Sequence, residues 1–385
     1  MAHLWVCAVV LVQGGDKGQA NSYDDAWEAA WVNHCRSVLS GGTGKTAGFV
    51  LQIGDSITHA NPYSQWPRSG GGATTEDATL LAWIHAADGF PISNNSDTSI
   101  KNGFYLAVAD TSSVRGMTAA GGLDTAEALS GDGNGGTPMP TQSDPATARG
   151  IVANGTTYTG NLNLSTVAAA FEDAQFAVTM LGTNDIDGGR SVNAALSDLA
   201  TLVGLLEARH TVVILSTIPP HYDANRNANV VSFNAGVRNL AMTRGLPLID
   251  FYAEILARRP GTSWNGTLLA ANDVHPSSSG GGYDSSSNPY ADGGNPATHA
   301  TGAACLNVGY LLRSWLTVQK LKEVRTYVVN GVDPPTNDDS GGGHHCGGPV
   351  DASGTGRSGM GILTAILILA FGLRRAVRLL GRPAS

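Results

Sequence analysis

Charged residues are scarce in this chain, and basic ones are scarcer than acidic ones. Asp, Glu, Lys and Arg make up 14% of the 385 residues, and the formal net charge at pH 7 is -8. Proteins that bind the phosphate backbone of nucleic acids instead carry clusters of Lys and Arg. We therefore expect no nucleic-acid partner. The length and the 42% hydrophobic content suffice for one large core.

Cysteine is also rare, with four in the whole chain. Cys7 lies in the N-terminal apolar run and Cys346 in the C-terminal tail, which leaves Cys35 and Cys305 in the central region. These two either form a disulfide, as exported proteins often do, or remain two buried free thiols.

No convincing metal motif is present. The closest is His344-His-Cys346, which offers too few ligands for a structural zinc ion, since such an ion takes four. We expect neither a metal nor a cofactor.

A phosphate-binding loop is also missing. In Gly41-Gly-Thr-Gly-Lys-Thr46 the required spacing would need glycine at Leu39, and the segment precedes a strand instead of following one. We interpret it as the end of a helix over Asp24–Leu39, in which Trp27 and Trp31 are i, i+4 neighbours.

The most informative stretch that is present is Phe49-Val-Leu-Gln-Ile-Gly-Asp-Ser-Ile-Thr58. Its apolar part predicts a buried strand of a parallel sheet, and ligands bind at the carboxyl ends of such strands. Ser56 at that end is a candidate nucleophile. The structural alternative is that Asp55 or Ser56 only caps the next helix.

Two further segments supply what a serine nucleophile needs, a base and donors for the oxyanion. His275, in the polar turn Ala271–Pro276, is the candidate base. Asn184 ends a second apolar run, Phe176–Asp185, and is the candidate donor. Taken singly, these would be a solvated loop histidine and a turn residue. Together with Ser56 they favour a catalytic site.

Three of these segments resemble blocks I, III and V of the SGNH, or GDSL-type, hydrolases: Gly54–Thr58, Gly182–Asp185 and Asp273–Pro276. Arg115–Leu129 resembles block II, whose glycine donates a backbone N–H to the oxyanion hole. Gly122 fits that position best, with Gly121 and Gly116 as rivals.

The resemblance covers roughly residues 48–324 and implies an α/β fold, a flavodoxin-like three-layer α/β/α sandwich with a central parallel sheet. Crossover helices are predicted over 191–208, 230–244 and 302–324, and later strands within 215–220 and 246–250. The family implies hydrolysis of an ester by Ser56 and His275. The amides of Ser56 and Gly122 and the side chain of Asn184 would hold the oxyanion.

Block V departs from the family pattern, which places an aspartate three residues before the histidine. Here that position is Asn272, and the acid nearby is Asp273. Three alternatives follow: a Ser56–His275 dyad helped by Asn272 or backbone carbonyls, a loop shifted by one residue so that Asp273 orients the ring, or a weakened enzyme.

The family implies an O-acyl ester of a glycan or a small lipid ester as substrate. Between blocks I and II, Tyr63 and Trp66 would stack on sugar rings or flank an acyl chain, or else pack in the core. A non-catalytic surface glycan-binding protein and an O-acyltransferase on the same fold are the alternatives to an esterase.

The two ends of the chain predict export. Residues 1–20 resemble a signal peptide, 21–332 form the hydrolase domain, 333–358 a Gly/Asp/Ser-rich linker, and 359–385 an apolar helix with an arginine-rich tail. That helix is shorter than the roughly 20 residues of a usual membrane span. Because arginines follow it, it still predicts membrane contact and resembles a myxobacterial-type sorting signal. We expect the protein outside the cytoplasm, in the cell envelope or secreted.

Overall fold

The computed structural model describes residues 23–69, 71–85, 119, 122–130, 151–153, 156–158 and 172–334. All of them lie in the first of the two units into which the chain divides, Met1–Pro334 and Pro335–Ser385. The predicted signal peptide, the C-terminal tail and the two rival glycines, Gly116 and Gly121, lie outside the described residues. Within the described residues, no helix is long and apolar enough to cross a membrane.

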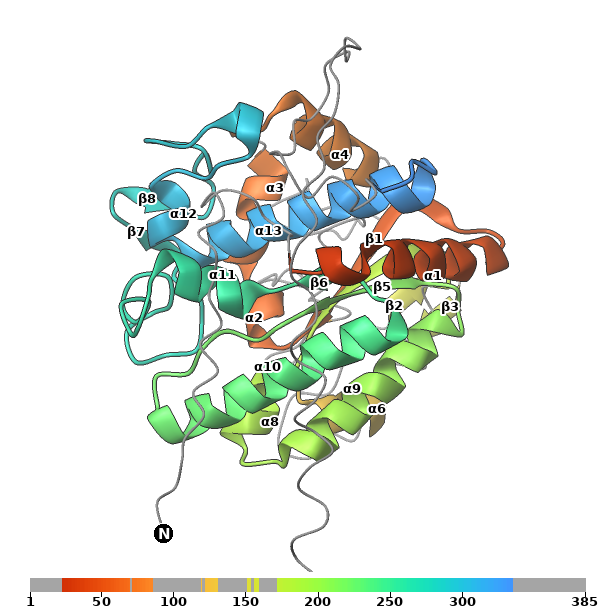
Figure 1. Cartoon of the computed structure of the whole chain (residues 1–385), viewed down its shortest axis with the longest axis horizontal. Helices are drawn as coiled ribbons and strands as arrows, with labels where there is room; N and C mark the ends of the chain where they lie inside the picture. The colour runs from red at the N-terminus through yellow and green to blue at the C-terminus, as the bar shows by residue number, and fades with distance from the viewer. Residues whose placement is uncertain are drawn as a thin grey trace, which may run out of the picture. The chain divides into compact units, whose positions relative to one another are not determined.

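A parallel sheet lies at the centre of the fold (Figure 1). Its strand order is β1 (Thr46–Gly54), β4 (Ala174–Met180), β5 (Val212–Ser216) and β6 (Leu248–Ile249). A parallel bridge between Gly54 and Ala119 adds the block II segment on the free side of β1. Numbered along the chain, the order is then 2-1-3-4-5, which is the flavodoxin-like doubly wound order.

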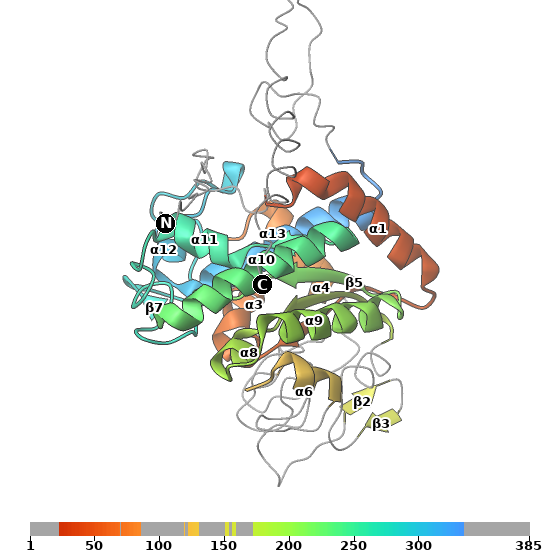
Figure 2. The ribbon, with the colours of Figure 1, turned by 60° about the horizontal axis from the view of Figure 1, so that its bottom comes forward.

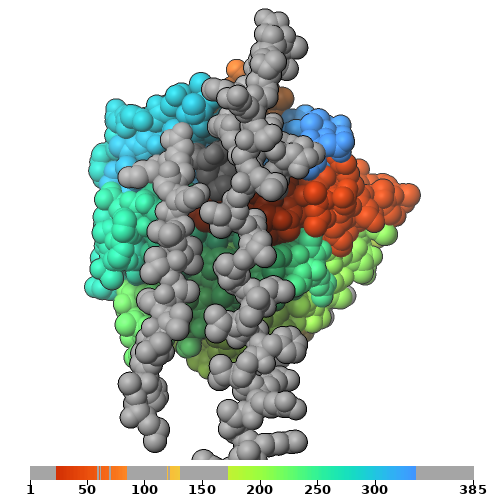
Figure 3. Space-filling view, viewed as in Figure 1, coloured from red at the N-terminus to blue at the C-terminus, as the bar shows by residue number. Residues whose placement is uncertain are grey.

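Helices cover both faces of this sheet. On one face α9 packs against α10 and α6, with α8 beside them. On the other face α13 packs against α4, and α1 lies nearby, as Figure 2 shows. In the space-filling view the red surface of α1 meets the green surface of α10 (Figure 3). The main helices are α1 (Glu28–Gly41), α4 (Thr75–His85), α6 (Thr125–Ser130), α8 (Thr183–Asp187), α9 (Val192–Glu207), α10 (Ala224–Arg244), α11 (Phe251–Arg258) and α13 (Gly309–Val324).

The remaining elements are short. They are η1 (Asp25–Trp27), α2 (Ser56–His59), η2 (Asn61–Ser64), α3 (Gln65–Ser69), β2 (Ile151–Ala153), β3 (Thr156–Tyr158), β7 (Ser279–Gly280), β8 (Tyr283–Asp284), η4 (Pro296–Thr298), α12 (Ala304–Asn307) and η5 (Arg325–Val329). With helices on both faces of a parallel sheet, the predicted three-layer α/β/α fold is confirmed.

Two of the predicted crossover helices differ from those observed. α10 begins at Ala224, capped by the Asp223 side chain, because its polar first turns lie outside the apolar periodicity that predicted a start at residue 230. The helix predicted over 302–324 is broken at Val308, whose backbone is extended. After the break, a side chain at Gly309 would lie 1.9 Å from the Leu268 carbonyl oxygen, so only glycine fits.

The segment that mimics a phosphate-binding loop has a structural role. α1 ends at Gly41, and Lys45 Nζ donates to the carbonyl oxygens of Glu172, Ala174 and Arg209 at 2.6 to 2.9 Å. Because Lys45 precedes β1 and its acceptors lie at the starts of β4 and β5, this lysine ties together the amino edge of the sheet.

The two cysteines of the described region are free and buried. Cys35 lies in α1 and Cys305 in α12. The sequence left open whether these cysteines form a disulfide or remain two buried free thiols, and the structure has the free thiols. Burial raises the pKa of the Cys305 thiol to about 12, so it is not poised for reaction at neutral pH.

Candidate active site

Ser56 lies where β1 passes into the short helix α2. The preceding Asp55 is fully buried, and its Oδ1 accepts a hydrogen bond from the Ile57 N–H at 2.9 Å. Asp55 therefore caps α2, as predicted, and leaves Ser56 as the first residue of the helix. The Ser56 N–H lies in the first turn, where N–H groups have no partner within the helix.

The Ser56 hydroxyl contacts His275, which follows it by 219 residues in the chain. Ser56 Oγ lies 2.8 Å from His275 Nε2, and His275 Nδ1 lies 2.7 Å from Asp273 Oδ1. A carboxylate can only accept, so Nδ1 carries the proton and Nε2 is free to accept one from the serine. This is the geometry that activation of a serine requires.

Of the two candidates for orienting the imidazole, the structure brings Asp273 to the ring and turns Asn272 away. Asn272 has a left-handed backbone with φ of 55°, a conformation that asparagine tolerates well. Its N–H donates to Asn265 Oδ1 at 2.7 Å, and its own Oδ1 accepts from the Asn265 amide. The spacing in this chain is thus Asp-x-His.

The carboxylate of Asp273 is held by its own loop. Its Oδ1 also accepts from the N–H groups of Val274 at 2.6 Å and His275 at 3.1 Å. Burial alone would raise the pKa of Asp273. The hydrogen bonds and charge of His275 outweigh that effect and hold the pKa below its usual range. The group that faces the imidazole is therefore ionised.

A contact between their segments brings Asn184 and Gly122 close to each other. Asn184, in the first turn of α8, donates from Nδ2 to the Leu123 carbonyl oxygen at 3.0 Å. Gly122 precedes that leucine and has a φ of 80°, which favours glycine. The bridge from Ala119 to Gly54 brings the same segment against the end of β1. Both predicted oxyanion residues thus lie at the carboxyl edge of the sheet.

A buried aspartate joins these two segments. Asp185 accepts from the Thr125 N–H at 3.0 Å and from Thr125 Oγ1 at 2.7 Å, and it pairs with Arg190 at 2.7 Å. Thr125 begins α6 and Asp185 lies in α8, so the carboxylate fixes the two helices to each other. Asp185 therefore has a structural role beside Asn184.

One residue that supports the site was not predicted from the sequence. Arg313 of α13 is buried, and its guanidinium donates to the Ile57 carbonyl oxygen at 2.9 Å and to Thr58 Oγ1 at 2.7 Å. It also stacks over the Tyr63 ring at 3.9 Å. Burial raises the pKa of the Asp55 carboxyl, and the positive charge of Arg313 opposes that shift. The available signal was an arginine among apolar residues in the first half of α13, where Leu311, Leu312, Trp315 and Leu316 surround it.

The prediction that Tyr63 and Trp66 bind substrate is wrong in this structure. Tyr63 is 1% exposed, and its hydroxyl bonds to Gln52 Oε1 at 3.0 Å and Thr317 Oγ1 at 2.9 Å. Trp66 is fully buried and donates to the Gly71 carbonyl oxygen at 2.9 Å. Both rings belong to the core, the alternative that the sequence left open, because α13 covers this segment.

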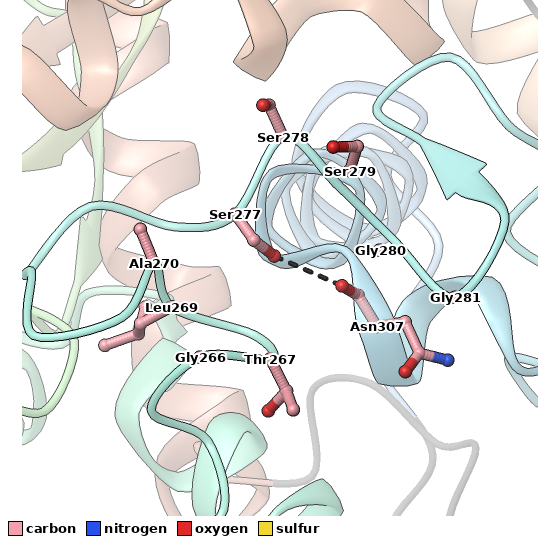
Figure 4. A pocket seen from close by; sticks show the side chains of 10 residues that line it. All are labelled: Gly266, Thr267, Leu269, Ala270, Ser277, Ser278, Ser279, Gly280, Gly281 and Asn307. Carbon is pink, nitrogen blue, oxygen red and sulfur yellow. Dashed lines mark hydrogen bonds between the residues drawn. The ribbon is translucent and has the colours of Figure 1, made fainter.

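A pocket of about 380 Å³ lies next to the loop that carries His275 (Figure 4). Ser277 is one of its lining residues and donates from Oγ to the Asn307 carbonyl oxygen at 3.2 Å. The others are Gly266, Thr267, Leu269, Ala270, Ser278, Ser279, Gly280, Gly281 and Asn307 itself. Neither Ser56 nor His275 lines this pocket, so it is separate from the serine site. In the described part of the chain, no group of His, Cys, Asp or Glu could hold a metal ion.

Residues 115–281 match the profile of the GDSL-like lipase/acylhydrolase family. The matched segment includes Gly122, Asn184 and His275 but begins after Ser56, and the contact between Ser56 and His275 connects the two parts. The fold, this contact and the matched segment support an ester-hydrolysing enzyme, similar over residues 115–281 to the GDSL-like lipase/acylhydrolase family.

Solved structures of similar fold include a carbohydrate esterase family 3 protein from Talaromyces cellulolyticus, with 13% identity and a TM-score of 0.39 over 74% of this chain and 99% of the other. A GDSL-like lipase from Bacteroides thetaiotaomicron has 13% identity and a TM-score of 0.34 over 64% and 90%. A catalytic mutant of an acetylxylan esterase from Geobacillus stearothermophilus has 14% identity and a TM-score of 0.33 over 61% and 88%. No curated protein matches the sequence.

Proposed function

We propose that this protein is a serine esterase that hydrolyses O-acyl groups on glycans, or small lipid esters, through an acyl-enzyme on Ser56. The observation that carries the proposal is the continuous chain of short contacts from Ser56 Oγ through the His275 imidazole to the Asp273 carboxylate. Each atom in that chain has the donor or acceptor character that proton removal from serine requires.

In the proposed reaction, His275 Nε2 takes the Ser56 proton as Oγ attacks the ester carbonyl carbon. The negative charge that develops on the carbonyl oxygen is held by the N–H groups of Ser56 and Gly122 and by the Asn184 side chain. His275 then returns the proton to the leaving alcohol. In the second half, His275 removes a proton from water as the water attacks the acyl carbonyl carbon, and it returns that proton to Ser56 Oγ as the bond between the acyl group and the serine breaks. Asp273 orients the ring and stabilises the imidazolium.

We also propose that the enzyme acts outside the cytoplasm. The supporting features are the predicted signal peptide at 1–20 and the apolar helix with its arginine-rich tail at 359–385, where membrane contact would occur. Between them, residues 21–332 would form the hydrolase domain and 333–358 a linker.

The test is release of p-nitrophenol from acetyl and longer acyl esters by the full chain and by Ser56→Ala. We expect turnover by the native protein, none by the variant, and labelling of Ser56 by a fluorophosphonate probe. A folded native protein that neither turns over these esters nor reacts with the probe would exclude the serine esterase and favour a non-catalytic glycan-binding protein. Acyl transfer to an added sugar in preference to water would identify an acyltransferase.

A further inference from the structure

We propose that Tyr222 and the turn around it form a sugar-binding subsite next to the catalytic serine, so that the substrate is an acylated glycan and not a lipid ester. This inference rests on the proposed esterase function and names the class of alcohol that carries the acyl group.

Tyr222 is exposed although the fold gives no reason for it. Its side chain is 46% exposed, and it is the one aromatic residue among the exposed large hydrophobic residues of the described region. The others in that group are Val231, Met242, Leu306 and Val332. Leaving an aromatic ring in water forgoes the stabilisation that its burial would bring.

The ring of Tyr222 is held in place from behind. It stacks on the buried His221 ring, with centroids 4.6 Å apart and an angle of 24° between the planes. His221 Nδ1 accepts from the Asp223 N–H at 2.9 Å, so its Nε2 carries the proton and donates to Asp187 Oδ1 at 2.9 Å. The His221 N–H also donates to Asn227 Oδ1 at 2.9 Å. The Tyr222 ring and the His221 ring behind it, which we call the platform, are therefore held in one arrangement before any ligand binds. This lowers the entropy cost of binding.

The platform lies at the same edge of the sheet as the candidate catalytic residues. Tyr222 follows the carboxyl end of β5, which pairs with β4, and the exit of β4 leads into α8. Within α8, Asn184 and Asp187 are three residues apart and so lie one turn from each other on the same face. Because Asp187 contacts His221, the platform is one helical turn from the proposed oxyanion donor, where substrates of such sheets bind.

The groups around Tyr222 suit a sugar better than an acyl chain. Arg226 Nη1 donates to Asp187 Oδ1 at 3.0 Å, and the two side chains are 45% and 33% exposed. A sugar ring has an apolar C–H face that packs on an aromatic ring, and hydroxyl groups at its edge that bond to a carboxylate and a guanidinium. An alkyl chain in the same place would remove water from this ion pair. The hydrogen bonds that Arg226 and Asp187 make to that water would be lost, and the alkyl chain would offer none in their place.

The test compares a small ester with a large one. Steady-state kinetics are measured on p-nitrophenyl acetate and on O-acetylated xylo-oligosaccharides for the native chain, Tyr222→Ala and Tyr222→Phe. Met242→Ala is the matched control, since it removes an exposed apolar side chain near the C-terminal end of α10, the helix whose N-terminus follows Tyr222. We expect Tyr222→Ala to raise KM for the oligosaccharides roughly tenfold, because one stacking contact between the ring and the sugar is lost. The kinetics on p-nitrophenyl acetate stay unchanged, and Tyr222→Phe and Met242→Ala behave as the native protein.

An equal effect of Tyr222→Ala on both substrates would mean a structural role and would overturn the proposal, as would no effect on either. Binding of unacylated xylo-oligosaccharides, measured by calorimetry on native protein, Ser56→Ala and Tyr222→Ala, separates this proposal from the esterase function. Binding that depends on Tyr222 in a protein without turnover would support the subsite and reject the esterase. Turnover of the glycan esters with no dependence on Tyr222 would support the esterase function and reject the subsite.

Discussion

At the scale of single residues, one oxygen atom organises the proposed catalytic loop. Asp273 Oδ1 accepts from the ring of His275 and from two consecutive backbone N–H groups. Since these bonds lower the pKa of Asp273, the stability that they contribute is present above the pKa of the unfolded chain. It is lost only as the pH falls through the lowered value in the folded protein. The loop should therefore keep its geometry at mildly acidic pH.

Replacing Asp273 by asparagine should lower kcat by about 10²- to 10⁴-fold, because an amide allows the wrong histidine tautomer. Asn272→Asp should leave kcat within about twofold, since its side chain pairs with Asn265 and not with the ring. Both are measured on p-nitrophenyl acetate. A large gain in Asn272→Asp would show instead that residue 272 holds the acid position in solution.

The sequence was informative about Ser56, His275 and Asn184 because each follows a recognisable strand or turn. It left Asn272 and Asp273 as alternatives, since which side chain meets the ring depends on the left-handed backbone of Asn272. It also left open whether Tyr63 binds substrate or packs in the core, and the ring is buried. Burial of that ring comes from α13, more than 240 residues later in the chain, and local pattern carries no such information.

At the scale of elements, the placement of α2 depends on α13. Arg313 bonds to two successive residues of α2, Ile57 and Thr58, and these follow directly after Ser56. Its planar guanidinium reaches both acceptors at once, which the single ammonium group of lysine does not. We infer that Arg313 is a positioning residue for the nucleophile.

Arg313→Lys should therefore lower the free energy of unfolding by about 1–3 kcal/mol, because a buried acceptor loses its donor. It should also lower kcat several-fold while KM stays unchanged, since the substrate does not touch this residue. Chemical denaturation and steady-state kinetics measure the two effects. Unchanged kcat together with reduced stability would assign Arg313 to the core alone.

Strands and helices with strong periodicity were predictable from the sequence. The helix predicted over 191–208 matches α9 with its caps at Ser191 and Ala208. β6 lies inside the strand predicted within 246–250, whereas the single bridge at Ala119 carries too few residues for a pattern of its own. Their places in the sheet are set by the neighbouring strands.

At the scale of the whole molecule, a buried charge cluster connects the first described segment to α13, the last long helix of the described region. Lys320 Nζ is fully buried and lies 2.8 Å from Asp24 Oδ1 and 2.6 Å from Glu323 Oε2. Asp24 Oδ2 also accepts from the Leu248 N–H at 2.8 Å. Burial and the charge of Asp24 outweigh the attraction of Lys320 and raise the pKa of Glu323 to about 8.

This cluster predicts that stability falls with rising pH. Between the usual carboxyl pKa of about 4.5 and the folded value of about 8, the native state holds a proton on Glu323 that the unfolded chain has lost. The free energy of unfolding should thus decline by a few kcal/mol across this window. Glu323→Gln should flatten the decline in urea unfolding at several pH values. Glu172→Gln, which removes an exposed carboxyl, should leave the slope as it is.

The pairing of Asp24 with Lys320 also sets the order of events during synthesis. The two residues are 296 positions apart, so at about 5–20 residues per second the ribosome adds the lysine roughly 15 to 60 s after the aspartate. Until then the aspartate lacks its cation and Ser56 lacks the arginine that supports it. A chain that ends before α13 would therefore lack a support of its candidate nucleophile, so we expect the proposed esterase activity only after this helix has been made.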